Sequence, residues 1–307
     1  MAAVWSVAAI CLLSVQVALG SGGAEHNWGY DPHNDDGTFN PETWYKVNEN
    51  CNGTRQSPVN IGCSNVHSDG IVEELIFENY FNPVKGLVMI NEGHTIKVEV
   101  PDAAGLRLRS AGLPAPYRLK QLHFHWGVPP DGGSEHTVNG KRWPLEMHLV
   151  HVNENINPEQ ALHDPNGLVV VAVLFDPHQL KYSRHLMTLS YFVLDIMQKG
   201  QRVTLQDFAI GSLLPANYAN NYLRYSGSLT TPPCSEVVEW IILTRTSSVG
   251  WAHVNNFMSV KDTVDTEEVA VEANNRPIQP LNDRPVRLMG NLGSSFPVCH
   301  SYCKYYV

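Results

Sequence analysis

The chain has 307 residues, of which 43% are hydrophobic and 17% are charged, so its apolar side chains can fill a core and wholesale disorder is excluded. Lys and Arg total 21 against 30 Asp and Glu, which gives a formal net charge of −9 at pH 7. Because phosphate contacts need clustered basic residues, this acidic balance argues against nucleic acid and anionic membranes as partners.

The first predicted element is a secretory signal peptide over residues 1–20. An apolar run from Val4 to Leu13 is followed by Ala18 and Gly20, small residues that suit cleavage before Ser21. An uncleaved membrane anchor is the alternative, because no basic residue precedes the run. The run is short for a span and polar residues interrupt it, which favours cleavage. We therefore expect a secreted, extracellular protein with no membrane span after signal removal.

The mature chain carries one glycosylation sequon and five cysteines. Asn52 begins the sequon Asn52-Gly53-Thr54, which a secreted protein can use. An oxidising compartment favours disulfides, but an odd number leaves at least one cysteine free or joined to a second chain, so a disulfide-linked dimer is open. Spacing alone does not give the connectivity. A zinc site at the last two cysteines lacks a second ligand pair. The five are Cys51, Cys63, Cys234, Cys299 and Cys303.

Short strands dominate the body of the chain. The run from Leu168 to Phe175 is apolar throughout, which is typical of a central strand covered on both faces. Helical signals are few and short, and the best of them lie at Ser183–Gln198 and Thr266–Asn274. The other runs with strand length and β-branched content are Leu87–Ile90, Thr95–Val100, Leu119–Trp126, Leu145–Val152 and Val237–Leu243.

The pattern predicts one domain over residues 28–292, built on a large sheet with small peripheral helices. A short segment, 21–27, precedes it. A polar tail, 293–307, follows it, holds two cysteines and lacks the hydrophobic ending of a lipid-anchor signal.

Two of the predicted strands carry a cluster of histidines. Side chains alternate along a strand, so Gln121, His123 and His125 share one face. The second strand places Glu146 and His148 on a common face. Paired side by side, the strands present three imidazoles with a carboxamide and a carboxylate beside them.

Three neutral imidazoles leave the fourth tetrahedral position of Zn²⁺ open, as in a catalytic rather than a structural site. Gln121 and Glu146 are suited to accept hydrogen bonds from the other ring nitrogens and so to fix the ligand tautomers. The pattern alone leaves an alternative open, because a chain with 14 His can hold such a cluster for structural reasons.

Seven segments, taken in chain order, resemble the α-class carbonic anhydrase family. They cover the chain from about Trp28 to Leu292. The segments are Trp28-Gly29-Tyr30, Arg55-Gln56-Ser57-Pro58-Val59-Asn60-Ile61, His123-Phe124-His125-Trp126-Gly127, Gly133-Ser134-Glu135-His136-Thr137-Val138, Glu146-Met147-His148-Leu149-Val150-His151, Gly227-Ser228-Leu229-Thr230-Thr231-Pro232-Pro233-Cys234 and Asn274-Asn275-Arg276-Pro277-Ile278-Gln279-Pro280-Leu281.

The resemblance implies a mainly β fold, α+β by some counts. Its sheet is twisted and mostly antiparallel, has about ten strands, and carries a conical cleft over its centre. It also implies zinc-dependent reversible hydration of carbon dioxide to bicarbonate and a proton. In that reaction a zinc-bound hydroxide attacks carbon dioxide, and a histidine then passes the proton to buffer. Sulfonamides or anions are the implied inhibitors.

The resemblance also assigns roles to residues. His123, His125 and His148 resemble the zinc ligands. Thr230 resembles the hydroxyl that accepts a hydrogen bond from the nucleophile and donates to Glu135. The implied carbon dioxide pocket is an apolar wall with a threonine at the cleft lining: Val150, Val170, Leu229, Thr231, Val238 and Trp240.

The implied proton path runs through His94, a shuttle histidine, and Tyr30, a residue that orders water. Glu92 and Lys97 are charged where fast members of the family often have amides. A carboxylate raises the pKa of a neighbouring imidazole and a cation lowers it, so the rate class stays open.

The resemblance to secreted members of the family implies a disulfide between Cys51 and Cys234. A link from Cys63 to the tail, with one spare thiol, is a further hypothesis. Two other functions stay open: an acatalytic matrix or binding protein, which would typically lack a ligand histidine, and a zinc hydrolase of esters, for which the sequence gives no pocket signal.

Overall fold

The computed structural model describes residues 28–30, 38–68, 73–110, 112–177, 184–219, 221–264 and 267–290. The predicted signal peptide, the segment 21–27, the tail 293–307 with Cys299 and Cys303, and the side chain of Cys63 lie outside these described residues. No helix within the described ranges is long and apolar enough to cross a bilayer.

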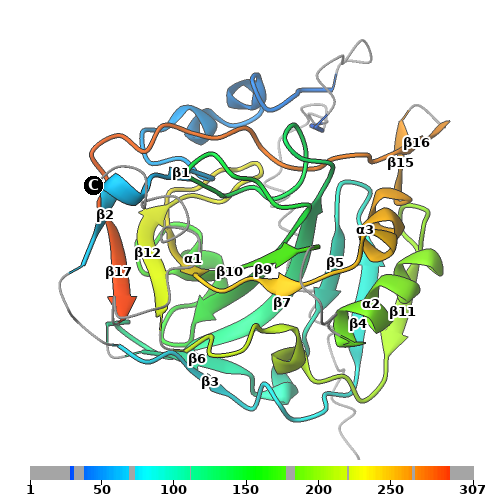
Figure 1. Cartoon of the computed structure of the whole chain (residues 1–307), viewed down its shortest axis with the longest axis horizontal. Helices are drawn as coiled ribbons and strands as arrows, with labels where there is room; N and C mark the ends of the chain where they lie inside the picture. The colour runs from blue at the N-terminus through cyan, green and yellow to red at the C-terminus, as the bar shows by residue number, and fades with distance from the viewer. Residues whose placement is uncertain are drawn as a thin grey trace, which may run out of the picture.

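One large twisted sheet forms the frame of the described structure (Figure 1). Its main path has the order β11-β4-β5-β7-β9-β10-β13-β12-β17-β2. Most neighbours are antiparallel, whereas β10–β13 and β17–β2 are parallel. The strands are β2 (Val66–His67), β4 (Leu87–Asn91), β5 (Ile96–Glu99), β7 (Tyr117–Trp126), β9 (Leu145–Asn153), β10 (Leu168–Asp176), β11 (Arg202–Leu205), β12 (Asn221–Gly227), β13 (Val238–Leu243) and β17 (Val286–Gly290).

The remaining elements are short and lie around this path. Three short strands join the large sheet outside its main path: β3 (Ile76–Glu78), β6 (Arg107–Arg109) and β14 (Ser247–Ser248). Two further sheets have two strands each: β1 (Asn60–Ile61) pairs with β8 (Thr137–Val138), and β15 (Lys261–Val264) pairs with β16 (Glu267–Ala270). The helices are α1 (Pro158–Ala161), α2 (Arg184–Leu194) and α3 (Trp251–Met258), and the 3-10 turns are η1 (Trp44–Lys46), η2 (Glu49–Asn52), η3 (Cys63–Asn65), η4 (Asp102–Ala104) and η5 (Ile210–Leu213).

The two faces of β10 divide the core. Val169, Val171, Val173 and Phe175 pack into a large cluster that also receives α2 and α3, whereas the alternate residues of β10 pack into a second cluster on the opposite face. The prediction of a central strand covered on both faces is confirmed. The fold class and all six predicted strand regions are confirmed as well.

The helix predicted at Thr266–Asn274 is wrong. Glu267–Ala270 forms β16 instead and pairs antiparallel with β15. The ammonium of Lys261 lies 2.8 Å from a carboxylate oxygen of Glu268 across this hairpin. The four β16 residues are exposed, so no apolar helical face stabilises a helix there. Helix α3 was missed; it begins at Trp251 and packs against α2.

A candidate metal centre and its cleft

The pairing of β7 with β9 brings the three predicted imidazoles together. His123 lies directly opposite His148, and His125 lies opposite Glu146. Leu122, on the other face of β7, packs into the large core cluster. His125 and His148 are each 1% exposed. The period of two along each strand and the register between them are sufficient to gather the cluster.

Each imidazole donates a hydrogen bond outward through the ring nitrogen that faces away from the cluster. His123 Nδ1 lies 2.9 Å from Gln121 Oε1, and His148 Nε2 lies 2.7 Å from Glu146 Oε1. His125 Nδ1 donates to the backbone carbonyl of Asn274 at 2.8 Å. This third partner was missed, because a main-chain carbonyl 149 residues away leaves no signal in the sequence.

The inner ring nitrogens converge on one point. His148 Nδ1 lies 3.3 Å from His123 Nε2, and one nitrogen from each of the three rings lies within 4.8 Å of the others. His125 Nε2 is buried and has no hydrogen-bond partner among the described residues. Since the outer nitrogens carry the protons, the inner ones present lone pairs to each other and repel unless a cation lies between them.

The donor set fits Zn²⁺. Two nitrogens bound tetrahedrally at about 2.0–2.1 Å lie about 3.3–3.4 Å apart, which matches the spacing of His123 and His148. Burial holds the pKa of His123 well below its ordinary value, and the neighbouring His125 and His148 lower it further. Burial also lowers the pKa of His125. Both rings are therefore neutral near pH 7, as metal ligation requires.

Glu146 anchors a second, fully buried histidine. Its Oε1 accepts from both His148 Nε2 and His136 Nδ1, and its Oε2 accepts from the backbone N–H of His136 at 2.8 Å. Burial alone would raise the pKa of Glu146, but His136 and His148 outweigh it and hold this pKa below its ordinary value. His136 Nε2 in turn lies 2.8 Å from the Tyr225 hydroxyl. His136 belongs to the segment Gly133–Val138 of the family resemblance, but nothing in the sequence predicted its contact with Glu146.

An apolar cavity of about 140 Å³ opens beside the imidazoles. Five of the six predicted pocket residues line it: Val150, Val170, Leu229, Thr231 and Trp240. Val238, the sixth predicted residue, is not among the residues that line this cavity. Val238 is 1% exposed within the core, and its cross-strand partner Leu168 lines the cavity instead.

A second, larger cavity of about 430 Å³ has a more polar lining than the first, and we call it the polar cavity. The two cavities share Gln121, His123, Thr231 and Pro232. His94 and Tyr30 line the polar cavity. The His94 ring centroid lies 4.6 Å from that of Trp28. Burial lowers the pKa of His94, and nearby Glu92 opposes this effect.

The charged neighbours of His94 pair with one another. The buried ammonium of Lys97 contacts the carboxylate of Glu92 and lies 3.1 Å from that of Glu99. These contacts offset the charge of Lys97 inside the polar cavity.

Thr230 and Glu135 are both buried beside the cluster. Glu135 Oε1 accepts a hydrogen bond from the backbone N–H of Arg276 at 2.9 Å. Glu135 Oε2 has no hydrogen-bond partner among the described residues, so the hydrogen bond expected from Thr230 is not formed there. The carboxylate lies close to the imidazoles instead, with Oε2 3.9 Å from His148 Nδ1.

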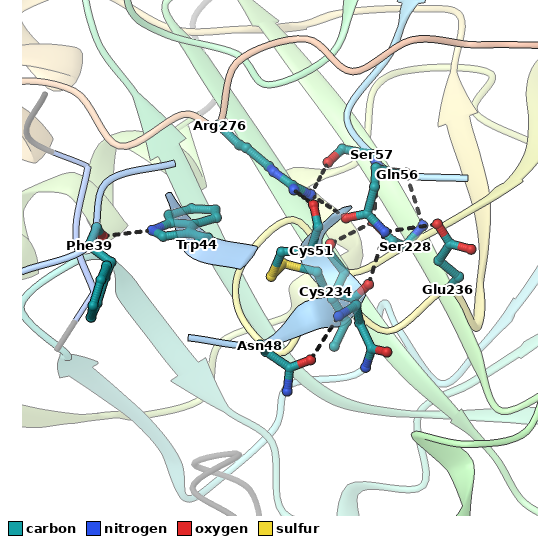
Figure 2. The surroundings of a disulfide bond; sticks show 12 residues. Phe39, Trp44, Asn48, Cys51, Gln56, Ser57, Ser228, Cys234, Glu236 and Arg276 are labelled. Atoms are coloured by element: carbon teal, nitrogen blue, oxygen red, sulfur yellow. Dashed lines mark hydrogen bonds between the residues drawn. A yellow bond between two sulfur atoms is a disulfide. The ribbon is translucent and has the colours of Figure 1, made fainter. Parts of the chain in front are cut away.

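A disulfide between Cys51 and Cys234, the pairing that the resemblance implied, ties the loop after β12 to η2 (Figure 2). Cys234 donates its backbone N–H to the Thr231 carbonyl, close to Thr230. The Cys51 carbonyl accepts from the Arg276 guanidinium at 3.1 Å. Figure 2 shows this guanidinium bridging to Gln56 and Ser57 as well.

The predicted glycosylation site also lies in this region. Asn52 follows Cys51 in η2, and its side chain is exposed.

Comparison with known proteins gives concordant results. The family model for eukaryotic-type carbonic anhydrases matches residues 39–290. Carbonic anhydrase 7 of Homo sapiens is 37% identical over 266 residues, which cover 85% of this chain and 97% of that protein. Carbonic anhydrase 15 of Mus musculus is 37% identical over 271 residues, which cover 84% of this chain and 82% of that protein.

Proposed function

Because the chain belongs to the eukaryotic-type carbonic anhydrase family, we propose that it catalyses the reversible hydration of carbon dioxide to bicarbonate and a proton at a zinc ion. His123, His125 and His148 would hold the ion. The observation that carries the proposal is the convergence of three inner nitrogens on one point, while every outer nitrogen is hydrogen-bonded to an oxygen. Zn²⁺ bound there supplies a Lewis acid that makes water nucleophilic near neutral pH.

The apolar wall holds the other substrate. Carbon dioxide has no charge and no hydrogen-bond donor, so it favours the surface formed by Val150, Val170, Leu229 and Trp240 over bulk water. This wall lies against His148, which keeps the carbon atom near the metal position.

Thr230 orients the attacking water. We assign its hydroxyl proton to Glu135 Oε2; this hydrogen bond is not formed in the structure, but Oε2 is buried and has no other partner among the described residues. A hydroxyl that donates to this carboxylate can only accept from the water, so the water's lone pair faces the carbon atom. The backbone N–H of Arg276 holds the other oxygen of Glu135 in place.

His94 carries the proton to buffer. It lines the polar cavity with His123, and Tyr30, whose buried hydroxyl has no partner in the described part of the chain, can bind water on the way. The lowered pKa of His94 favours release of the proton over its uptake.

The setting of the enzyme is part of the proposal. The predicted signal peptide supports a secreted, extracellular location, and the exposure of Asn52 supports its glycosylation. An odd cysteine permits a disulfide-linked dimer, and convergent metal ligands support inhibition by anions and sulfonamides. An acatalytic binding role receives no support, because all three ligand histidines are present.

Stopped-flow measurement of carbon dioxide hydration, with and without a zinc chelator, tests the function. We expect rapid hydration that the chelator abolishes and added zinc restores. Thr230→Ala should retain zinc and lose about 100-fold in rate, since it removes orientation rather than the metal. A purified chain with full zinc content and no hydration activity would contradict the proposal.

A further inference from the structure

Lys120 lies at an irregularity of β7, the strand that carries His123. Leu119 pairs with His151 and Gln121 pairs with Val150, so Lys120 is an extra residue without a partner on β9. Regular alternation would send the side chains of Lys120 and Gln121 to opposite faces. Both line the apolar cavity, because a bulge redirects the side chain at this point.

The lining of the apolar cavity includes apolar residues outside the carbon dioxide wall. Besides His148 and Thr230 it includes Val152, Leu162, Leu168 and Pro158, the first residue of α1. We call the part of the cavity lined by these four apolar residues the apolar arm. A single water needs about 10–15 Å³ on the same measure, so a three-atom substrate fills only part of about 140 Å³. The arm therefore has room for a larger apolar group.

Lys120 gives the arm its charge preference. Among the described residues that line the cavity, it is the one with a permanent charge, and no carboxylate lines it. Its side chain is 16% exposed and contacts Asp102 at 2.5 Å, while Asp102 is 50% exposed. An ammonium has three N–H donors, and an ion pair with such an exposed partner is weak, so a second carboxylate can join or displace Asp102.

We propose that the apolar arm binds an amphiphilic organic monoanion, an aryl or alkyl carboxylate. Its apolar body lies against Val152, Leu162 and Leu168, and its carboxylate pairs with Lys120. This site shares its cavity with the metal position, because His123 and His148 also line it, but the carboxylate pairs with Lys120 rather than with the metal. Its occupancy does not depend on the catalytic proposal.

Calorimetric titration of the zinc-loaded full chain tests the proposal, with 3-phenylpropionate as the probe and 3-phenylpropanamide as its neutral match. Saturating azide is present to occupy the metal position. We expect the carboxylate to bind about five-fold more tightly than the amide, as one partly exposed charge-assisted hydrogen bond predicts. Lys120→Gln should remove that preference and leave amide binding unchanged.

Two further variants complete the design. Lys261→Gln, which removes a carboxylate-paired lysine on the β15–β16 hairpin, should leave the preference intact. Asp102→Asn removes the competing carboxylate and should tighten carboxylate binding about two-fold, which also tests the site if Lys120→Gln fails to fold. Equal binding of the two probes, loss of carboxylate binding in azide, or an unchanged preference in Lys120→Gln would each overturn the proposal.

Discussion

The β7–β9 strand pair and the loop from Gly227 to Cys234 meet at the same cavity but are held in place by different means. On the strands, His123 and His148 are set by the ladder itself. On the loop, Ser228 exchanges hydrogen bonds with Ser57, 171 residues away, and the disulfide spans 183 residues. The pairing of the two strands thus places the candidate metal ligands, whereas distant segments hold the loop that carries Thr230 and Thr231.

This difference predicts that changes in the two regions have separable effects. A change on the strands should act first on metal content. A change in the loop or its tethers should act on stability or rate while the metal remains bound. The predictions below test that separation, from the largest expected effect to the smallest.

The largest effect is expected from His148→Ala on β9. It removes one of three ligands and leaves Glu146 without one of its partners. Loss of a hydrogen-bond partner of a metal-binding histidine lowers metal affinity about 10–100-fold. Loss of the histidine itself should lower zinc affinity further, and hydration activity should be lost with the metal. Zinc content by atomic absorption and stopped-flow rates check both. His185→Ala, on α2 and outside the cluster, is the matched control and should keep its zinc.

Removal of the disulfide should lower the stability of the folded chain and leave zinc binding unchanged. Cys51→Ser, Cys234→Ser and the double variant should each lower the free energy of unfolding by about 2–5 kcal/mol, because each frees the same long loop in the unfolded chain. Denaturant unfolding measures this loss. Zinc content of the folded variants should match that of the parent chain. A disulfide variant that folds and lacks zinc would argue against the separation of the two regions.

Glu146→Gln tests the outer contacts of the strand region. One amide oxygen cannot replace two carboxylate oxygens that accept from both His136 and His148. Zinc affinity should fall about 10–100-fold, as measured by competition with a chelator. Gln121→Ala removes a neutral acceptor from the less buried His123 and should cost less. An equal loss in both variants would show that the charge of Glu146 contributes nothing.

The smallest effect is expected from His94→Ala, because His94 lies outside both the β7–β9 strand pair and the loop from Gly227 to Cys234. Turnover should fall several-fold in weak buffer and recover when imidazole is added, because the variant removes a proton carrier rather than the chemistry at the metal. Stopped-flow rates across buffer concentrations measure it. An unchanged rate in weak buffer would remove His94 from the mechanism.

The sequence by itself determined six of the ten strands on the main path of the sheet, and the common face of Gln121, His123 and His125. The reason is local: the alternation of a strand depends on neighbouring residues alone. Local composition also led to the wrong prediction of a helix at Thr266–Asn274, where Glu267–Ala270 pairs with β15 instead.

Only the tertiary structure decided the contacts that join distant segments. The Asn274 carbonyl on His125 and the place of His136 against Glu146 depend on how loops return to the sheet. The direction of Lys120 depends on a bulge in the pairing of two strands. Such contacts form between groups far apart in the chain and often through the backbone, so no spacing of residue types records them.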